Sequence, residues 1–318
     1  MIENILELQN LTMHFTIGSN RIIKAVEDIN LEIQKGETFG LVGESGCGKS
    51  TLGRMIKGIY KPTAGHIIFQ GIDILKMNIQ QKKAFQRNMQ IIFQDPYSSL
   101  NPRMTVRELL GEGLEIHKLG DKKQREKKIY DCLEMVGLNP EYVTRFAHEF
   151  SGGQRQRLAI ARALAVEPKF IICDEPISSL DVSIQGQIVN LLKDLQYKLG
   201  LTYLFIAHDL SMVKYISDRV GVMYLGRIVE IAPKKELFEN PKHPYTQVLL
   251  SSIPIPDPKI ERNRKEIIIE GEIPSATEKI NGCSFKSRCP FASSSCEQME
   301  YTLKNIGKQH YIMCAKFQ

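Results

Sequence analysis

The segment that most constrains this chain is the run from Gly43 to Thr51, which follows a short apolar stretch at 39–42. It fits the pattern G-x-x-x-x-G-K-[ST], in which glycines let successive backbone N–H groups curl around phosphate oxygens. The sequence predicts a strand over 38–42 and a helix over 51–58, whose N-terminus adds positive partial charge. We therefore expect a nucleotide-binding phosphate loop at this position. Its residues are Gly43, Glu44, Ser45, Gly46, Cys47, Gly48, Lys49, Ser50 and Thr51.

Two side chains of this loop have chemical roles. Lys49 supplies a mobile positive charge for the β- and γ-phosphates, and the hydroxyl of Ser50 suits a magnesium ion. Cys47 lies inside the loop and is assigned no role beyond that of a small residue.

A second acidic site is predicted where the apolar run 170–173 ends in Asp174 and Glu175. Ligands of α/β proteins bind at the carboxyl ends of the sheet strands. An aspartate there can hold magnesium through water, and Glu175 can orient and partly deprotonate the attacking water. Such a run is common by itself, so this interpretation depends on the phosphate loop upstream.

Composition excludes several classes of protein. The 318 residues are 42% hydrophobic and 25% charged, which is ordinary for a soluble globular chain and unlike collagen-like, low-complexity or disordered sequences. No run reaches the ~18–20 apolar residues that a membrane helix needs, and the N-terminus lacks the pattern of a secretory signal. A cytosolic chain is therefore expected. The net charge of +6 is interspersed and does not indicate nucleic-acid binding.

Further short motifs complete a recognisable set. Ser151, Gly152, Gly153 and Gln154 precede a segment with helical spacing, and Gln94, Asp181 and His208 follow apolar segments or loops in a fixed order. Together with the phosphate loop and acidic strand end, they resemble the motifs of ATP-binding-cassette ATPases over residues 4–250. The fold that this predicts is α/β, with a phosphate-loop (RecA-like) core, an antiparallel β subdomain and a helical subdomain at about 96–160.

The resemblance implies a role for each motif. Gln94 ligates magnesium or its water and senses the membrane partner, His208 hydrogen-bonds the γ-phosphate, and Phe15 lies against adenine by a looser match. Glu175, His208 and Gln94 are the catalytic set, and ATP and Mg²⁺ are the implied ligands. Asp181 acts across a dimer interface.

The run Ser151–Gly153 is a second amide-rich helix N-terminus, and one nucleotide cannot easily use two such anion sites of one cassette. This favours a second chain that lends its Ser151 run to the γ-phosphate. The resemblance implies that two cassettes sandwich two ATP molecules head to tail and open after hydrolysis.

The segments 94–103 and 240–246 are more particular. They resemble the ATPase subunits of bacterial dipeptide and oligopeptide importers, whose relatives carry nickel, and are more similar to the second ATPase chain of such importers. This implies a heterodimer with a homologous ATPase subunit, two membrane permease subunits, an extracellular substrate-binding protein and a place at the cytoplasmic face of the membrane. Import of nickel or another chelate, a soluble cassette ATPase, a regulatory iron–sulfur module and an exporter subunit are the alternatives.

The C-terminal part, 266–318, is predicted to be a small cysteine-rich module after a proline-rich linker at 251–265. Four of the seven cysteines, Cys283, Cys289, Cys296 and Cys314, are spaced x5, x6 and x17, unlike common zinc or iron–sulfur sites. The resemblance implies a [4Fe–4S] cluster on these four, while zinc and unconnected thiols remain alternatives. His310 is interpreted as a surface histidine.

Overall fold

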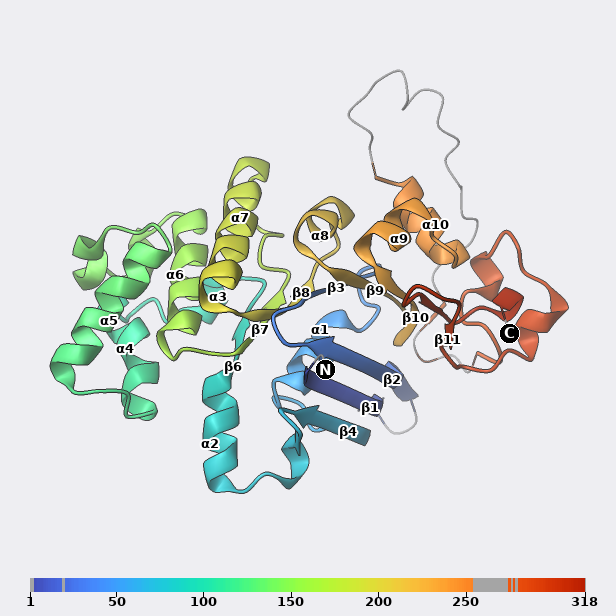
Figure 1. Cartoon of the computed structure of the whole chain (residues 1–318), viewed down its shortest axis with the longest axis horizontal. Helices are drawn as coiled ribbons and strands as arrows, with labels where there is room; N and C mark the ends of the chain where they lie inside the picture. The colour runs from blue at the N-terminus through green and yellow to red at the C-terminus, as the bar shows by residue number, and fades with distance from the viewer. Residues whose placement is uncertain (1–2, 19–20, 254–273, 276, 278–279, 318) are drawn as a thin grey trace, which may run out of the picture.

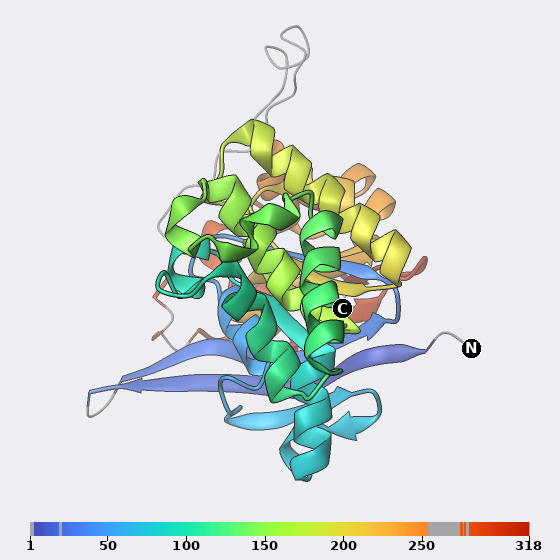
Figure 2. The ribbon, with the colours of Figure 1, turned by 90° about the vertical axis from the view of Figure 1, so that its left-hand side faces the viewer.

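The computed structural model describes residues 3–18, 21–253, 274–275, 277 and 280–317. Two sheets form the centre of the molecule, with a helical region on one side and the C-terminal tail (residues 280–317) on the other (Figure 1). Seen from the side, the helical region stands above the long strands of the antiparallel sheet (Figure 2). Within these ranges, no helix has both the length and the apolar character needed to cross a membrane.

The strands are β1 (Asn4–Ile17), β2 (Arg21–Gln34), β3 (Thr38–Val42), β4 (Ala64–Phe69), β5 (Ile72–Asp73), β6 (Met89–Ile92), β7 (Phe170–Asp174), β8 (Thr202–Ile206), β9 (Arg219–Tyr224), β10 (Arg227–Pro233), β11 (Lys304–Asn305) and β12 (Tyr311–Ile312). The α-helices are α1 (Lys49–Ile56), α2 (Ile79–Asn88), α3 (Pro96–Ser99), α4 (Val106–Ile116), α5 (Lys122–Met135), α6 (Gly152–Ala165), α7 (Val182–Leu199), α8 (Leu210–Ile216), α9 (Lys234–Glu239) and α10 (Pro244–Ser251). Short 3₁₀ turns are η1 (Ile74–Lys76), η2 (Pro140–Thr144), η3 (Ala147–Glu149), η4 (Lys286–Arg288), η5 (Ser294–Glu297) and η6 (Ala315–Phe317).

The antiparallel sheet has the strand order β2-β1-β4-β5. Its two long strands bury one face because apolar residues alternate with polar ones, as in the pairs Leu6↔Ile33 and Leu8↔Leu31. This face belongs to the same buried cluster as Leu52 of α1. Period-two alternation in the first 35 residues of the sequence predicts half-buried antiparallel strands, and the structure confirms this prediction.

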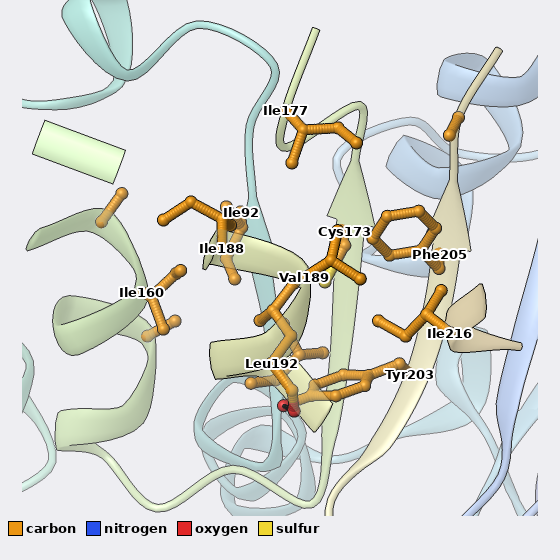
Figure 3. Packing of buried hydrophobic residues seen from close by; sticks show 14 of the residues in the cluster. Ile92, Ile160, Cys173, Ile177, Ile188, Val189, Leu192, Tyr203, Phe205 and Ile216 are labelled. Carbon is orange, nitrogen blue, oxygen red and sulfur yellow. Dashed lines mark hydrogen bonds between the residues drawn. The ribbon is translucent and has the colours of Figure 1, made fainter. Parts of the chain in front are cut away.

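The central sheet has the order β11-β12-β10-β9-β3-β8-β7-β6, and β9, β3, β8, β7 and β6 run parallel. Both faces of its inner strands are covered, which is why they are apolar throughout. Tyr203 and Phe205 of β8 pack with α7 on one face (Figure 3), whereas Leu204 and Ile206 contact the cluster around α1 on the other. The strand predicted at 38–42 has the predicted bounds.

The helical region comprises α3 to α6, and α6 contacts α3, α4, α5 and α7. Helix α5 begins after Asp121, whose side chain accepts the N–H of Gln124, and it buries Ile129 and Leu133 at helical spacing. Helix α6 begins after Ser151 with a reciprocal capping pair, because Ser151 accepts from the N–H of Gln154 and the Gln154 side chain accepts from that of Ser151. The sequence predicts both helices, because apolar residues recur at helical spacing in 121–135 and in the segment after Gln154.

The tail is joined to the cassette by strand pairing. β12 pairs antiparallel with β10, through Glu230↔Ile312 and Ile231↔Tyr311, so the tail extends the edge of the central sheet. Most of the predicted linker at 251–265, and the first residues of the predicted module to 273, lie outside the described residues. The predicted domain boundaries therefore stay predictions.

The interpretation of His310 as a surface histidine is wrong. Its side chain is 3% exposed, and its Nε2 lies 2.6 Å from Oε1 of Glu230, which is fully buried on β10. The same carboxylate accepts the backbone N–H groups of Lys242 and His243. No local sequence pattern indicates this pairing, because the partners are 80 positions apart.

This buried pair predicts a large effect of Glu230→Ala on stability. The variant leaves the His310 ring nitrogen and two backbone N–H groups buried without their acceptor, so the free energy of unfolding should fall by about 3 kcal/mol. Chemical denaturation followed by circular dichroism measures the change. The matched control is Lys308→Ala, which removes an exposed ion pair to Glu236 and should have little effect. Equal effects of the two substitutions on the free energy of unfolding would contradict the stabilising role of the buried Glu230–His310 pair.

Candidate active site

The phosphate loop curls around the ammonium group of Lys49. This group is buried and donates to the carbonyl oxygens of Gly43 at 2.7 Å and Glu44 at 2.9 Å. The loop runs from the end of β3 into α1, as the sequence predicted, although α1 begins at Lys49 rather than at Thr51. A positive charge is thus fixed inside a ring of backbone amides at the positive end of a helix.

Two loop glycines are required by close contacts. Gly48 has φ +106°, and a Cβ there would lie 2.0 Å from the carbonyl oxygen of Ala25. A Cβ at Gly43 would lie 2.1 Å from the carbonyl oxygen of Met223. The backbone of the loop therefore packs directly on β2 and on the end of β9.

Ser50 and Asp174 form the candidate magnesium site. The Ser50 hydroxyl donates to Oδ1 of Asp174 at 2.7 Å. Burial raises the pKa of Asp174, and the Ser50 hydrogen bond partly offsets this. A buried carboxylate beside a hydroxyl at the end of a central strand is an oxygen donor set that suits Mg²⁺. The two residues, each predicted separately to have a role at magnesium, are thus in contact, and their role at the metal stays a prediction.

Glu175 lies at the centre of a second group of side chains. Nε2 of Gln94 donates to its Oε2 at 2.7 Å, and Nδ1 of His208 lies 3.6 Å from the same oxygen. Glu175 has a left-handed backbone, with φ +48°, and its N–H donates to the carbonyl of Ile206 on β8. Strain of this kind in a residue other than glycine is concentrated at functional sites. The three predicted catalytic residues are therefore in contact.

The loop and this group border one open pocket of about 370 Å³. Ten of the predicted residues line it: Phe15, Ser45, Gly46, Cys47, Gly48, Lys49, Ser50, Thr51, Gln94 and Glu175. Asp174 is buried and contacts Ser50, whereas His208 is exposed and contacts Glu175. Phe15 is at the side of the pocket, where its ring meets Tyr60 edge to face at 5.6 Å between ring centres.

Ser151, Gly152, Gly153, Gln154 and Asp181 do not line this pocket. They lie together at the starts of α6 and α7, because a Cβ at Gly153 would be 2.7 Å from a methyl carbon of Ile184. Ser151 and Asp181 are exposed there. The chain thus carries two separate sets of predicted nucleotide-binding residues.

The four tail cysteines line a second cavity, of about 340 Å³, together with His243, Phe285 and Phe291. Burial raises the pKa of the Cys283 thiol to about 11, and the nearby thiols add to the effect. Among the described residues, no group of three or more His, Cys, Asp or Glu side chains is arranged to hold a metal ion. The predicted iron–sulfur cluster therefore has no support from a preformed ligand set.

Sequence reasoning missed two residues that support the phosphate loop and one that supports Phe15. The Tyr245 hydroxyl accepts the N–H of Glu44 at 2.9 Å, and Arg288 of the tail pairs with the Glu44 carboxylate. Tyr60 supports Phe15. Tyr245 lies in the segment 240–246, which the sequence analysis singled out without assigning a role to its residues. No sequence pattern pointed to Arg288.

Comparison with known proteins agrees with this geometry. Residues 26–178 match the ABC transporter family, and residues 229–296 match the family described as Oligopeptide/dipeptide transporter, C-terminal region. Among solved structures, the ATP-binding cassette MJ0796, described as a dimer in a post-hydrolysis state bound to ADP and Pi, is 30% identical with a TM-score of 0.65. The match covers 72% of this chain and 98% of that one.

Relatives match over almost the whole chain. Oligopeptide transport ATP-binding protein OppF of Bacillus subtilis (strain 168) is 54% identical, over 99% of this chain and 98% of that protein. The putative oligopeptide transport ATP-binding protein YkfD of the same organism is 53% identical, over 98% of this chain and 94% of that protein. The chain therefore belongs to the ABC transporter family, among the oligopeptide transport ATP-binding proteins.

Proposed function

We propose that this chain is the ATP-hydrolysing subunit of a transporter that imports oligopeptides. The observation that carries the proposal is the contact of Gln94 and His208 with Glu175, at the pocket that Lys49 and the phosphate loop border. Two relatives, which are 53% and 54% identical to this chain, are named as oligopeptide transport ATP-binding proteins, and their names indicate oligopeptides as the transported class. They do not favour nickel import or a cassette uncoupled from transport.

Hydrolysis needs a base beside the attacking water and positive charge around the γ-phosphate. Glu175 takes the role of base, and its carboxylate is oriented by the amide of Gln94. His208 hydrogen-bonds the γ-phosphate, and Lys49 with the loop amides binds the β- and γ-phosphates. Ser50, Asp174 and Gln94 would hold Mg²⁺, which neutralises phosphate charge when bound.

A second cassette completes the site. The run Ser151–Gln154 and Asp181 lie outside the pocket and are accessible, which suits a role at the nucleotide of a facing chain. In this arrangement two cassettes hold two ATP molecules head to tail, and loss of the γ-phosphate lets them separate. We propose a homologous second ATPase chain as the partner, so that the dimer is a heterodimer.

The transporter also requires partners in the membrane. The proposed assembly has two permease subunits, with this chain bound peripherally at their cytoplasmic face, and an extracellular substrate-binding protein that delivers the peptide. The names of the relatives support such an assembly because they describe peptide transport and import ATP-binding proteins.

The proposed function predicts a specific effect of Glu175→Gln. Since the amide keeps the shape of the side chain but cannot accept the proton, the variant should bind ATP while hydrolysis falls by about 10²-fold or more. ATP should also hold the cassette dimer closed. Phosphate release and size-exclusion chromatography in ATP measure the two effects. Normal turnover would exclude Glu175 as the base.

We also propose that the tail cysteines hold a [4Fe–4S] cluster, as in the importer ATPases that the sequence resembles. The observation that supports this proposal is that all four cysteines line one cavity. Cys283, Cys289, Cys296 and Cys314 would be its ligands. When bound, the cluster would cross-link a segment with little regular structure.

The cluster predicts about four iron and about four sulfide per chain after purification without oxygen. Elemental analysis and acid-labile sulfide measure both. Cys296→Ser should lower the iron content sharply, whereas Cys132→Ser, which changes a buried thiol of α5, should not. Zinc alone, or no metal, would refute the cluster.

A further inference from the structure

An ion pair connects the C-terminal tail to the phosphate loop. Nη1 of Arg288 lies 3.0 Å from Oε2 of Glu44, and Nη2 lies 3.2 Å from Oε1. The two side chains are 10% and 25% exposed, so solvent and salt screen the pair less than they screen a surface pair. The paired geometry fixes the direction of the Glu44 carboxylate as well as its distance.

The main chain of Glu44 in turn positions Lys49. Its carbonyl oxygen accepts the Lys49 ammonium at 2.9 Å, and its N–H donates to the Tyr245 hydroxyl at 2.9 Å. A change in the orientation of Glu44 therefore moves an acceptor of the lysine that meets the phosphates. Glu44 is held at its side chain by the tail and at its backbone by α10.

Arg288 is itself held by a rigid support. It lies in η4, between the fully buried Phe285 and Cys289. The Phe285 ring meets Tyr224 and Tyr245 with ring centres 5.3 Å and 5.4 Å apart. Nη1 of Arg288 also donates to the Tyr224 hydroxyl at 3.4 Å. The aromatic contacts thus fix the base of the arginine relative to the loop.

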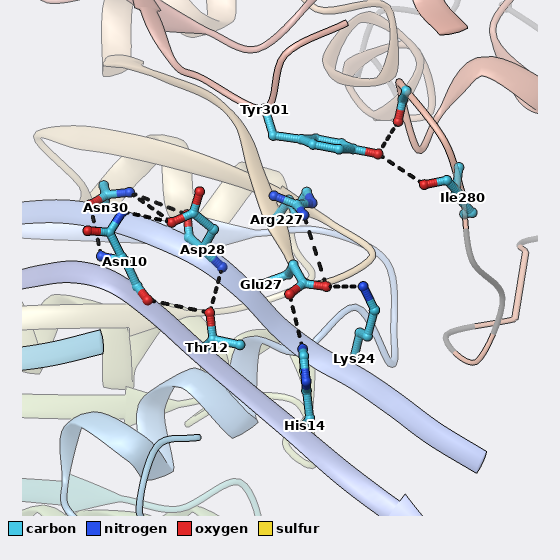
Figure 4. A network of polar contacts seen from close by, with 11 residues as sticks. Asn10, Thr12, His14, Lys24, Glu27, Asp28, Asn30, Arg227, Ile280 and Tyr301 are labelled. Atoms are coloured by element: carbon cyan, nitrogen blue, oxygen red, sulfur yellow. Dashed lines mark hydrogen bonds and ion pairs between the residues drawn. The ribbon is translucent and has the colours of Figure 1, made fainter. Parts of the chain in front are cut away.

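A second tail contact joins Tyr301 to Arg227 of β10 and, through it, to Glu27 of β2 (Figure 4). The guanidinium of Arg227 lies 3.8 Å from the ring centre of Tyr301 and 4.0 Å from the Glu27 carboxylate. Glu27 also pairs at 2.7 Å with Lys24, which lines the pocket. The tail is therefore linked to the pocket residue Lys24 through Arg227 and Glu27.

We infer that Arg288 is a positioning residue for nucleotide binding, which acts through Glu44 on the phosphate loop. It holds the Glu44 carbonyl in place for Lys49, and it neutralises a carboxylate that would otherwise repel the triphosphate. This inference rests on the proposed function, since it assigns the tail to the same ATP site. The tail is then a working part of the cassette rather than an independent appendage.

The test is the affinity of the full-length chain for ATP with Mg²⁺, measured by titration calorimetry. Arg288→Gln should weaken binding about tenfold, which corresponds to about 1.4 kcal/mol, the scale of one charge-assisted pair. Arg288→Lys keeps the positive charge but loses the two-nitrogen contact with the Glu44 carboxylate, so it should weaken ATP binding less than Arg288→Gln. In the assembled transporter, Arg288→Gln should raise KM for ATP far more than it changes kcat.

Two comparisons separate positioning from a general loss of structure. Since the two residues act as a unit, the double variant Glu44→Gln with Arg288→Gln should bind ATP no more weakly than Arg288→Gln alone. Lys286→Gln, in the same turn but paired with Glu297, should bind ATP like the wild type. Wild-type affinity in Arg288→Gln, or equal losses in Lys286→Gln, would overturn the inference. If Lys49→Ala also kept wild-type affinity, the proposed function itself would fail.

Discussion

The placement of the Lys49 ammonium group inside the phosphate loop is the constraint on which the rest of the site depends. Two loop carbonyls hold it, and the close approach of Ala25 and Met223 leaves room only for glycine at the two tightest points. The loop can adopt this form because it is held between β3, which ends inside a sheet covered on both faces, and α1, which begins at Lys49. Phosphate recognition therefore depends on the position of the loop at the carboxyl end of a central strand as much as on the sequence motif.

The shared carboxyl end of the parallel strands also explains why residues far apart in the sequence meet. β3, β7 and β8 are parallel neighbours, so the segments that follow them bring Lys49, Glu175 and His208 to one end of the sheet. The helical region places Ser151 and Asp181 on another surface. Residues of the phosphate loop line the pocket, whereas Ser151 and Asp181 do not. A chain with its nucleotide-binding residues divided in this way is suited to pair with a facing cassette.

Much of this could be predicted from the sequence, and the remainder has a physical reason. Short apolar runs that end in glycine or acid predicted β3 and β7, and their parallel pairing then required the contacts of Glu175. The tail was harder, because its contacts are non-local: Arg288 meets Glu44 across 244 positions, and His310 meets a carboxylate in a strand without local charge pattern. The clustering of four cysteines in the tail carries no information about these contacts.

The most direct measurement is a crystal structure of the chain with Mg²⁺ and a non-hydrolysable ATP analogue. The account predicts the β- and γ-phosphates within hydrogen-bonding distance of the loop amides and Lys49, Mg²⁺ beside Ser50, and the Ser151 helix of a second chain at the γ-phosphate. An analogue bound elsewhere, or a triphosphate held without contact to Lys49, would contradict it.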